Sequence, residues 1–457
     1  TDNAYTKQPN DFTQNIGNGS YSTADSYVKQ VWDGRYTGIR MCNQLLENID
    51  RVPDLDPELK KRYIGEAKVL RAYNYYELYT KFGDVPYTTK VLSIKESMSI
   101  ARTAKATVIA NILADLDEVI NGNYLPTSYD ADNKGRITRW AAMAIKAKIY
   151  LFEGNWTQVK NITSTIMTEG GFKLFGSYAG LFEIANEYNS EVILDAQYRP
   201  TSREHQMMYV FLPPTLGGYS QLSPLQELVD SYIMLDGKTI KETGTSFDES
   251  HPYANRDPRL KATVMYTGNS YTLADGTEVV INCEKGEGKD GYGVGSDCSA
   301  TGYYIKKYWD NTYRATLYSG LNPILIRYAD ILLMNAEALA ELGELDKTAW
   351  DATIKPIRDR AGFTLASALE FPEGASKDKL IEIVRNERRS ELALEGHRHK
   401  DIIRWRIADN VLNGWCHGLK TNDVVGTDDG YVRVENRTFN ANRHYLWPIP
   451  QAERDLN

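Results

Sequence analysis

Two blocks of amphipathic helix pattern, one toward each end of this 457-residue chain, enclose a long stretch that lacks the pattern. Apolar residues recur at helical spacing in both blocks, and turn-forming residues separate the segments. In DPELKKRY, Asp56 is placed to cap a helix and Pro57 suits its first turn, while Gly83 can end it. Helices are therefore predicted at residues 24–50, 57–82, 104–121, 138–153, 155–167, 322–343, 346–361 and 376–396.

Residues 172–321, between the two blocks, differ in composition from the helical parts. Gly, Pro, Asn and Asp are frequent there, and 15 of the 31 tyrosines of the chain lie in this stretch. Tyrosine offers a flat apolar face and a hydrogen-bonding hydroxyl, which suits a wet binding surface better than a core. The excess of 31 Tyr over 11 Phe is therefore a hint of polar-ligand or interface work.

Two helical segments echo each other across this stretch. KAKIYLFEGNW (146–156) and NAEALAELGEL (335–345) each place an alanine seven residues before a glycine. The small residue lets two helices approach closely and the glycine turns the chain, as in a tetratricopeptide (TPR) helix pair, although the strict period of about 34 residues is absent. The predicted fold is mainly α, with TPR-like helical hairpins in an α-superhelical scaffold and a loop-rich, partly β excursion. The expected parts are residues 1–171, 172–321 and 322–457, integrated in one domain.

The charge of the chain argues against a nucleic-acid partner. The formal net charge is −8 and the pI is near 5.5, so acidic residues balance or exceed Lys and Arg throughout. No apolar run approaches the ~18 residues that span a bilayer. The start, TDNAYTKQPND, is polar from its first residue, unlike a signal peptide.

The four cysteines stand at positions 42, 283, 298 and 416 and include no C-x-x-C pair. This spacing argues against a zinc ribbon and a thioredoxin-like site. Cys283 and Cys298 bracket a Gly-rich loop and can bridge in an exported protein. All four can equally be unpaired small hydrophobic residues, and the sequence leaves both alternatives open.

Motifs for nucleotide, calcium and catalytic sites fail on their context. GEGKDG (286–291) matches G-x-G-x-x-G, but no helix follows it to hold a pyrophosphate, which favours a mobile loop. DADNKG (130–135) begins like an EF-hand, but Ala141 stands where the bidentate glutamate belongs. P-loop, H-E-x-x-H and G-x-S-x-G motifs are absent from the sequence. No cofactor is expected, and His397 and His399 favour a solvated or capping pair over a metal site.

The segment VRNERRSELALEGHRHKDIIRW, residues 384–405, is unusually rich in charge. Glu387, Glu391 and Glu395 recur every four residues and therefore lie on one stripe of a helix. Paired carboxylates can perform glycosidase chemistry, but the abundant arginine of this segment neutralises such a stripe. The favoured interpretation is a half-buried Arg–Glu lattice that joins helices. Its expected members are Arg388, Arg389, Glu391, Glu395 and Arg404.

Several motifs together resemble the SusD/RagB family of nutrient-binding proteins. NPILIRYADILLMNAEALAELG is similar to the signature helix of the family, and the charged segment above to its E-R-R-x-E-L-x-x-E-G-H-R-x-x-D-x-x-R-W block. YLWPIPQAERDLN (445–457) is similar to its closing P-I-P segment. Further matches are GEAKVLRAYNYYELYTKFGDVP (65–86), NRDPRL (255–260) and GRITRWAAMAIKAKIYLFEGNW (135–156). The combination runs from about residue 25 to the end, and its order makes it specific.

The resemblance implies a lipid-anchored, cell-surface protein in the outer membrane of a Gram-negative bacterium, built on eight TPR-like helices with a loop-rich face. Such proteins capture glycans, or sometimes peptides, and act as a lid on a TonB-dependent SusC-like transporter; they are not enzymes. The lipidated N-terminal cysteine of the family is missing here, so we expect the signal peptide and anchor to precede Thr1. The chain is short for the family, and His399 and Lys400 replace residues that are often aromatic or apolar.

A sugar-binding site needs an aromatic platform for C–H faces and polar side chains for hydroxyl groups. The resemblance places such residues in the middle excursion, especially just before the RYAD motif, in KKYWDNTYRATLYSGLN (306–322). The expected ligand-binding residues are Trp309, Tyr313 and Arg314 with Asp310 or Asn311, then Tyr209, Tyr219 and Gln221, and finally Tyr292 in the GKDGYGVG loop. Each tyrosine can instead pack beneath its own loop.

Three other functions remain open at this point. A peptide or other nutrient receptor on the same scaffold, RagB-like, would use the same Tyr-rich surface. A TPR-like protein-interaction adaptor would carry its aromatic residues along a concave helical face, whereas much of the tyrosine here lies in the excursion. A glycosidase would need two carboxylates about 5–10 Å apart in a cleft.

Overall fold

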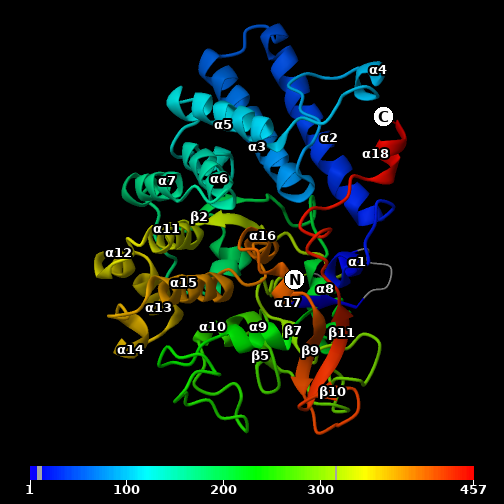
Figure 1. Ribbon diagram of the computed structural model, residues 1–457, viewed down its shortest axis with the longest axis vertical. Helices are drawn as coiled ribbons and strands as arrows, with labels where there is room; N and C mark the ends of the chain where they lie inside the picture. Colours follow the sequence, from blue (N-terminus) through cyan, green and yellow to red (C-terminus); the bar gives the residue numbers. More distant parts are fainter. Residues whose placement is uncertain (8–12, 314–315, 457) are drawn as a thin grey trace. The chain divides into compact units, whose positions relative to one another are not determined.

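The computed structural model of the chain describes residues 1–7, 13–313 and 316–456. By its internal contacts the chain divides into two compact units, whose elements are labelled in Figure 1. Unit 1 comprises residues 1–18, 172–402 and 410–438, and unit 2 comprises residues 19–171, 403–409 and 439–457. The excursion and most of the C-terminal helices therefore share one unit, and the N-terminal helices form the bulk of the other.

Unit 2 is a series of helices in which each long helix packs against the next along the chain. α2 packs on α3, α3 on α5, α5 on α6 and α6 on α7. This succession of hairpins is consistent with the TPR-like scaffold that the sequence predicts. The helices of unit 2 are α2 (Ser26–Asn48), α3 (Pro57–Phe82), α4 (Ile94–Ser97), α5 (Lys105–Asn121), α6 (Arg139–Phe152), α7 (Trp156–Glu169) and α18 (Gln451–Leu456).

The helix ends of unit 2 follow the local signals in the sequence. The Asp56 carboxylate accepts a hydrogen bond from the Leu59 amide at 2.8 Å, and Pro57 occupies the first turn of α3. Gly83 ends α3 with a φ of 73°, which a residue with a side chain rarely adopts. The remaining long helices begin and end within two residues of the predicted positions.

The helices of unit 1 carry the charged segment and the signature helix. α11 packs against α15, and shorter helices surround them. The helices in unit 1 are α1 (Thr13–Asn18), α8 (Met207–Phe211), α9 (Gln226–Ser231), α10 (Pro258–Thr263), α11 (Tyr328–Leu342), α12 (Lys347–Ala352), α13 (Ile354–Ala361), α14 (Ala366–Leu369) and α15 (Lys377–Glu391). Two further helices, α16 (Arg398–Arg404) and α17 (Ala408–Val411), span the boundaries between the units.

The three predicted C-terminal helices differ in part from those observed. Residues 324–327 form strand β8 rather than a helix start, and α11 begins only at Tyr328. The helix predicted at 346–361 breaks at Thr353, because Pro356 has no N–H to continue the α12 hydrogen bonds and instead lies in the first turn of α13. The helix predicted to end at 396 ends at Glu391, whose carbonyl accepts a hydrogen bond from Arg327 instead.

Short antiparallel strands organise the excursion, as the partly β prediction implied. Each pairs segments that are distant in sequence or joined by a tight turn, and β10–β11–β9 form the one sheet of three strands in the described chain. The pairs are β1 (Ala4–Thr6) with β3 (Leu222–Pro224), β2 (Val192–Asp195) with β8 (Ile324–Arg327), β4 (Val264–Met265) with β7 (Tyr304–Ile305), and β5 (Ser270–Thr272) with β6 (Glu278–Val280). The three-stranded sheet comprises β9 (Gly414–Lys420), β10 (Thr427–Asp428) and β11 (Tyr431–Arg437).

Several tyrosines of the excursion belong to its core rather than to its surface. Tyr271, Tyr303 and Tyr304 are at most 2% exposed. Their hydroxyl groups donate hydrogen bonds to Ile305 O, Gln226 Oε1 and Asp290 O, at 2.8, 2.6 and 2.5 Å. The tyrosine excess is therefore partly structural, because each of these three buried hydroxyl groups has an internal acceptor.

No helix in the described part of the chain is both long enough and apolar enough to cross a membrane.

Candidate functional site

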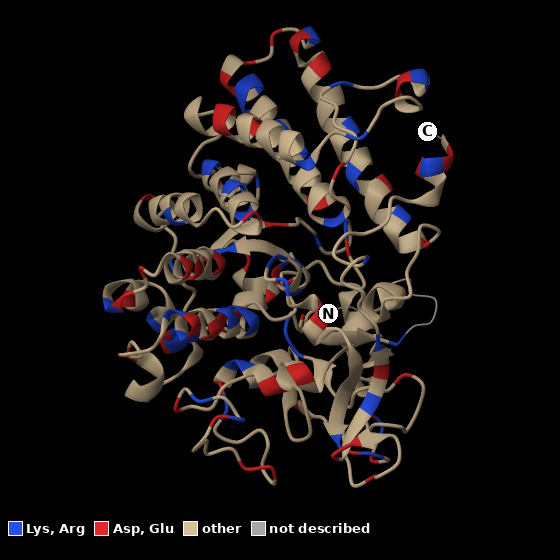
Figure 2. Ribbon diagram, viewed as in Figure 1, with Lys and Arg blue, Asp and Glu red and all other residues tan. Residues whose placement is uncertain are grey.

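The charged segment 384–405 builds the interior of unit 1. Figure 2 shows basic and acidic residues alternating along α15. The guanidinium of Arg327 lies 2.6 Å from Glu391, 2.7 Å from Glu191 and 2.7 Å from Glu395. Arg259 contacts Glu391 from another side at 2.8 Å. All five side chains are at most 1% exposed, so the stripe is a buried lattice rather than the half-buried one expected.

The lattice keeps its carboxylates ionised. Burial raises the pKa of Glu391, but the positive charges of Arg360, Arg327 and Arg259 outweigh that effect and hold it far below its ordinary value. A stripe of buried, arginine-bound carboxylates offers no free pair to a substrate. The scaffold interpretation is thereby confirmed for Glu391, and the glycosidase alternative finds no support in this segment.

The other expected members of the lattice also make structural contacts. Arg388 pairs with Asp330 at 2.6 Å and with Asp401 at 3.0 Å. Arg389 pairs with Asp2 at 3.0 Å and so attaches the start of the chain to α15. Arg404, in unit 2, lies over the ring of its neighbour Trp405, 4.8 Å from the ring centroid, and this local contact does not test its expected role in joining helices.

Trp309 and Tyr313 form an aromatic pair just before β8. Their ring centroids are 5.4 Å apart, and Trp309 also contacts Tyr271 at 5.0 Å. The Trp309 indole N–H donates to Thr272 O at 2.8 Å, and the Tyr313 hydroxyl donates to Leu216 O at 2.9 Å. Both residues are half-buried, and their polar tips are used in these internal hydrogen bonds.

The polar residues predicted beside this pair differ in accessibility. Asp310 is 1% exposed and accepts hydrogen bonds from Thr312 and from Ser319. It therefore fixes its own turn and is not open to a ligand. Asn311 is exposed. Arg314 lies outside the described residues.

Tyr209 and Tyr219 form a second aromatic pair. Their ring centroids are 4.2 Å apart with an interplanar angle of 31°, and the Tyr219 amide donates to Tyr209 O at 3.0 Å. Tyr219 is 38% exposed, which leaves its outer face available. Gln221 is half-buried, and its carbonyl accepts a hydrogen bond from the Lys7 amide at 3.0 Å.

The predicted segments converge on one turn, Pro214–Leu216. Leu216 O accepts the Tyr313 hydroxyl, and the Thr215 amide donates to Asp290 Oδ1 at 2.8 Å. Asp290 belongs to the Gly-rich loop, and its hydrogen bond ties that loop to the turn. Tyr292, two residues later, is half-buried and packs against the hydrophobic cluster that Leu216, Trp309 and Tyr313 also contact. We refer to Tyr209, Tyr219, Trp309 and Tyr313 as the turn surface.

A different set of tyrosines lines a cleft of about 960 Å³ in unit 1, called here the tyrosine cleft. The rings of Tyr253 and Tyr266 are stacked, with centroids 4.0 Å apart and an interplanar angle of 17°. The hydroxyl groups of Tyr253 and Tyr303 lie 3.2 Å apart, and Tyr303 donates to Gln226. Tyr431 of β11 also lines the cleft. Flat ring faces beside a hydroxyl and amide network suit a ligand with both apolar and polar faces.

The position of Tyr253 depends on Arg256, three residues later in the NRDPRL motif. The buried Arg256 guanidinium donates to Val229 O and Tyr232 O at 2.7 Å and to Pro252 O at 2.8 Å. These bonds fix the turn that presents Tyr253 to the cleft. The NRDPRL motif is visible in the sequence, but no sequence pattern indicates that Tyr253 meets Tyr266, 13 positions away.

Two ion pairs lie at the cleft. Lys285 of the Gly-rich loop pairs with Asp423, and Lys420 of β9 pairs with Glu249 at 2.9 Å. All four residues line the cleft, and their side chains are between 38% and 69% exposed. Exposed pairs of this kind contribute little to stability, and they leave charged groups within reach of a ligand.

The N-terminal segment of unit 1 also lies beside the predicted residues. β1 pairs with β3 in a register that places Thr6 opposite Leu222, and the Lys7 ammonium donates to Ser296 O and Cys298 O at 2.7 Å. Sequence reasoning missed this segment, because a three-residue strand carries no periodic signal.

The four cysteines are all free and buried, so Cys283 and Cys298 are not bridged. The Cys298 thiol instead donates to Lys289 O at 3.3 Å. Within the described ranges, no group of three or more His, Cys, Asp or Glu side chains is placed to hold a metal ion. In DADNKG, the Asp130 carboxylate accepts a hydrogen bond from the Asn133 amide and caps a short turn before α6.

Comparison with known proteins gives matches along nearly the whole chain. A family model described as the SusD family matches residues 181–457, and one described as starch-binding associating with outer membrane matches residues 1–151. A SusD-like protein of Formosa agariphila is 27% identical over 409 residues, which cover 84% of this chain and 71% of the relative.

Solved structures share the fold. The crystal structure of a SusD-like carbohydrate-binding protein from Bacteroides fragilis has a TM-score of 0.89 at 28% identity, and covers 100% of this chain and 90% of that one. A laminarin-binding SusD-like protein has a TM-score of 0.73 at 25% identity, with coverage of 100% and 90%.

Proposed function

The chain belongs to the SusD family, and on that premise we propose that it is a cell-surface protein that captures oligosaccharides for import. In this proposal a lipid anchor holds the protein at the outer membrane of a Gram-negative bacterium, and a TonB-dependent SusC-like transporter receives the glycan. Support comes from the family model described as starch-binding associating with outer membrane, and from the similarity to carbohydrate-binding and laminarin-binding proteins. The proposal assigns no catalytic step.

One observation carries the glycan proposal: the stacked Tyr253–Tyr266 pair lines a 960 Å³ cleft. Sugar rings present apolar C–H faces that pack on such tyrosines, and hydroxyl groups that need polar partners. The Tyr253 and Tyr303 hydroxyls supply partners at the same place. The volume is within the range of small-ligand sites, roughly 300–1,000 Å³.

The turn surface is the second proposed contact area for the same ligand. Tyr219 and Asn311 are exposed there, and the half-buried Trp309 and Tyr313 add ring faces. Gln221 and Tyr292 belong to the segments that adjoin it, and Arg314 remains part of the proposal although it lies outside the described residues. The turn surface and the tyrosine cleft share one hydrophobic core, to which Tyr253, Tyr266, Trp309 and Tyr313 all contribute.

A glycan array probed with the purified chain, followed by calorimetry, tests the proposal. The double variant Tyr253→Ala, Tyr266→Ala should lose the glycan that the wild type binds, while Tyr188→Ala, at an exposed tyrosine elsewhere in unit 1, should retain it. If only Trp309→Ala, Tyr313→Ala loses binding, the glycan function stands and the turn surface is the site. If no glycan binds but a peptide library does, the receptor is RagB-like and the glycan proposal is wrong. Binding of only a folded protein would instead indicate a TPR-like adaptor.

A further inference from the structure

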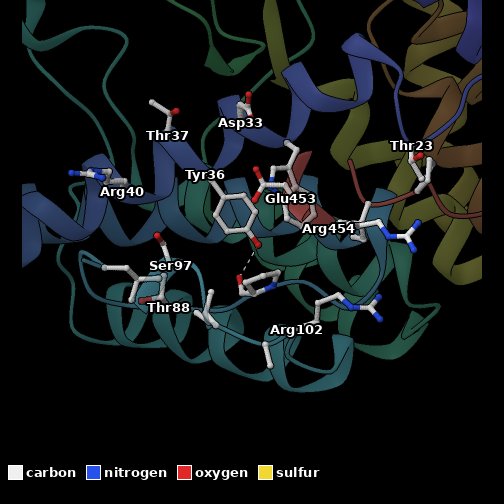
Figure 3. Close-up of a pocket in the computed structure, with 17 residues that line it drawn as sticks. Thr23, Asp33, Tyr36, Thr37, Arg40, Thr88, Ser97, Arg102, Glu453 and Arg454 are labelled. Carbon is white, nitrogen blue, oxygen red and sulfur yellow. Dashed lines mark hydrogen bonds between the residues drawn. The ribbon is translucent and has the colours of Figure 1, made fainter. Parts of the chain in front are cut away.

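Unit 2 contains a pocket of about 1090 Å³ that the proposed function does not use. Its walls come from the exposed face of α2, the segment between α3 and α5, and the C-terminal segment that ends in α18. Figure 3 shows the side chains that line it. Three of them are arginines, namely Arg40, Arg102 and Arg454, and we call this site the arginine pocket.

The three arginines carry unbalanced charge. In the described part of the chain none of them has a carboxylate within ion-pair distance, and none donates a side-chain hydrogen bond. Two other cations of unit 2 provide a contrast, because Arg71 pairs with Asp115 at 2.7 Å and Lys105 pairs with Glu153 at 2.9 Å. Like charges that line one pocket repel each other unless an anion joins them.

The acidic residues of the lining do not cancel this charge. They are Asp33 and Glu453. The Asp33 carboxylate pairs with Lys29 on the preceding turn of α2, so that pair is neutral by itself. The lining thus contains three arginines and two carboxylates, and it keeps a positive balance.

The arrangement of groups in the pocket suits a ligand that carries negative charge at its ends and an apolar face between them. Figure 3 shows the guanidinium groups of Arg102 and Arg454 toward one end, Arg40 toward the other, and the ring of Tyr36 between them. The Tyr36 hydroxyl donates to Pro86 O at 2.8 Å, and its ring contacts Trp32 at 4.9 Å between centroids. The tyrosine ring is therefore fixed as a wall.

Apolar and hydroxyl groups complete the lining. Pro86, Leu92, Ile100 and Ile449 supply apolar surface, and Thr37, Thr88 and Ser97 supply hydroxyl groups. Guanidinium groups bind carboxylate or sulfate in a two-point geometry. The hydroxyl groups and the ring suit the polar edges and the C–H faces of a sugar.

From these groups we infer that the arginine pocket is a second saccharide site, specific for sugars that carry a carboxylate or a sulfate group. An acidic peptide fits less well, because extended peptides gain affinity from main-chain hydrogen bonds, and the backbone of α2 satisfies its own donors and acceptors. The inference rests on the proposed function for the saccharide class of the ligand. The anion specificity is independent of the tyrosine cleft.

Calorimetry of the full chain with four probes of similar length tests this inference. They are an oligogalacturonate (carboxylate), a sulfated galactose oligosaccharide (sulfate), a neutral galactose oligosaccharide and hexaglutamate. The double variant Arg102→Gln, Arg454→Gln should weaken binding of an anionic sugar roughly tenfold or more, because charge-assisted hydrogen bonds are lost. Arg102→Lys, Arg454→Lys should lose part of the affinity, since lysine keeps the charge but not the two-point geometry.

Two controls locate the effect. Arg51→Gln removes an exposed arginine of unit 2 outside the pocket and should leave the affinity for the anionic sugar unchanged. Tyr253→Ala, Tyr266→Ala should also leave it unchanged, although the same variant should abolish capture of the array glycan. A variant that loses only the array glycan is therefore defective in the site of the proposed function. A variant that loses only the anionic sugar is defective in the arginine pocket.

The outcomes against the inference are equally distinct. Wild-type affinity for the anionic sugar in the Arg102→Gln, Arg454→Gln variant would overturn the inference. It would also be overturned if neither the oligogalacturonate nor the sulfated oligosaccharide bound to the wild type. Tighter arginine-dependent binding of hexaglutamate than of both anionic sugars would assign the pocket to an acidic peptide. Unfolding curves of the variants verify that they fold, which is expected because the replaced side chains are exposed.

Discussion

Arg327 and Glu391 form an ion pair in the interior of unit 1, with Nη1 2.6 Å from Oε1 and neither side chain more than 1% exposed. Arg327 is the last residue of β8, immediately before α11, and Glu391 is the last residue of α15. The pair therefore joins the signature helix to the charged helix at one point. Removing one partner of a buried ion pair is costly, because the other partner is then a buried charge that neither solvent nor an opposite charge stabilises.

Replacing Arg327 by Gln should destabilise the protein strongly. The change leaves Glu391, Glu395 and Glu191 with fewer positive partners in a buried site. The expected loss in the free energy of unfolding is about 3–5 kcal/mol, measured by urea denaturation. The control is Lys379→Gln on α15, the helix that ends at Glu391. Lys379 pairs with Glu382, which is 62% exposed, so this change should lower the free energy of unfolding by less than about 1 kcal/mol. Equal effects of the two changes would contradict the lattice as a source of stability.

The helical parts of this fold could be predicted because their signals are local. Asp56, Pro57 and Gly83 mark the ends of α3 within the sequence itself. The end of α15 could not be predicted, because the groups that donate to the carbonyl of its last residue, Arg327 and Lys307, come from remote segments. The early strand at 324–327 likewise depends on β2, about 130 positions earlier.

The candidate site was predictable only in its composition. Tyrosine enrichment pointed to the excursion, which supplies part of the lining of the cleft, but it did not indicate the residues that meet there or the β9–β11 residues that complete the lining. Tyr253 lies in a turn, Tyr266 directly follows β4 and Tyr303 directly precedes β7, and turns and two-residue strands have no periodic signature. Asp310 was expected to face a ligand, whereas Ser319 and Thr312 enclose it, a contact that sequence separation alone does not reveal.

Acid should destabilise the protein through Glu395. Burial raises the pKa of this carboxyl group, but the charges of Arg327 and Lys307 outweigh burial and lower the pKa from 4.5 to about 2. As pH falls, the unfolded chain therefore binds the proton first. The contribution of Glu395 to stability is complete above about pH 4.5 and is lost as pH falls toward 2. The difference between the two pKa values corresponds to roughly 3 kcal/mol.

Urea unfolding of the wild type and of Glu395→Gln between pH 2 and pH 7 measures this effect. The variant should be less stable at neutral pH, and the gap should narrow as pH falls from about 4.5 toward 2, because the carboxyl group takes up its proton first in the unfolded chain and only near pH 2 in the folded protein. Glu382→Gln, at an exposed position on α15, should follow the wild-type curve throughout. A gap of constant size across this range would show that Glu395 does not act through its charge.

Gly302, in the lining of the tyrosine cleft, should not tolerate a side chain. Its φ is 76°, and an added Cβ would lie 1.7 Å from Leu419 Cδ2. Gly302→Ala should therefore lower the free energy of unfolding by about 2 kcal/mol or more, through backbone strain and displacement of β9. Gly268→Ala is the matched control, because Gly268 also lines the cleft with a φ of 87° but has no atom within 4 Å of that position. It should cost only the strain, about 1 kcal/mol. Equal losses measured by urea denaturation would contradict the close approach to Leu419.

The aromatic ring and the hydroxyl group of Tyr253 should contribute separately to glycan binding. Tyr253→Phe keeps the ring that stacks on Tyr266 and removes only the hydroxyl 3.2 Å from Tyr303, so affinity should fall by no more than roughly fivefold. Tyr253→Ala removes the platform and should cost roughly tenfold or more. Calorimetry with the glycan identified on the array measures both changes, and thermal unfolding verifies that each variant is folded. Equal losses in Tyr253→Phe and Tyr253→Ala would mean that the hydroxyl, and not the ring face, holds the sugar.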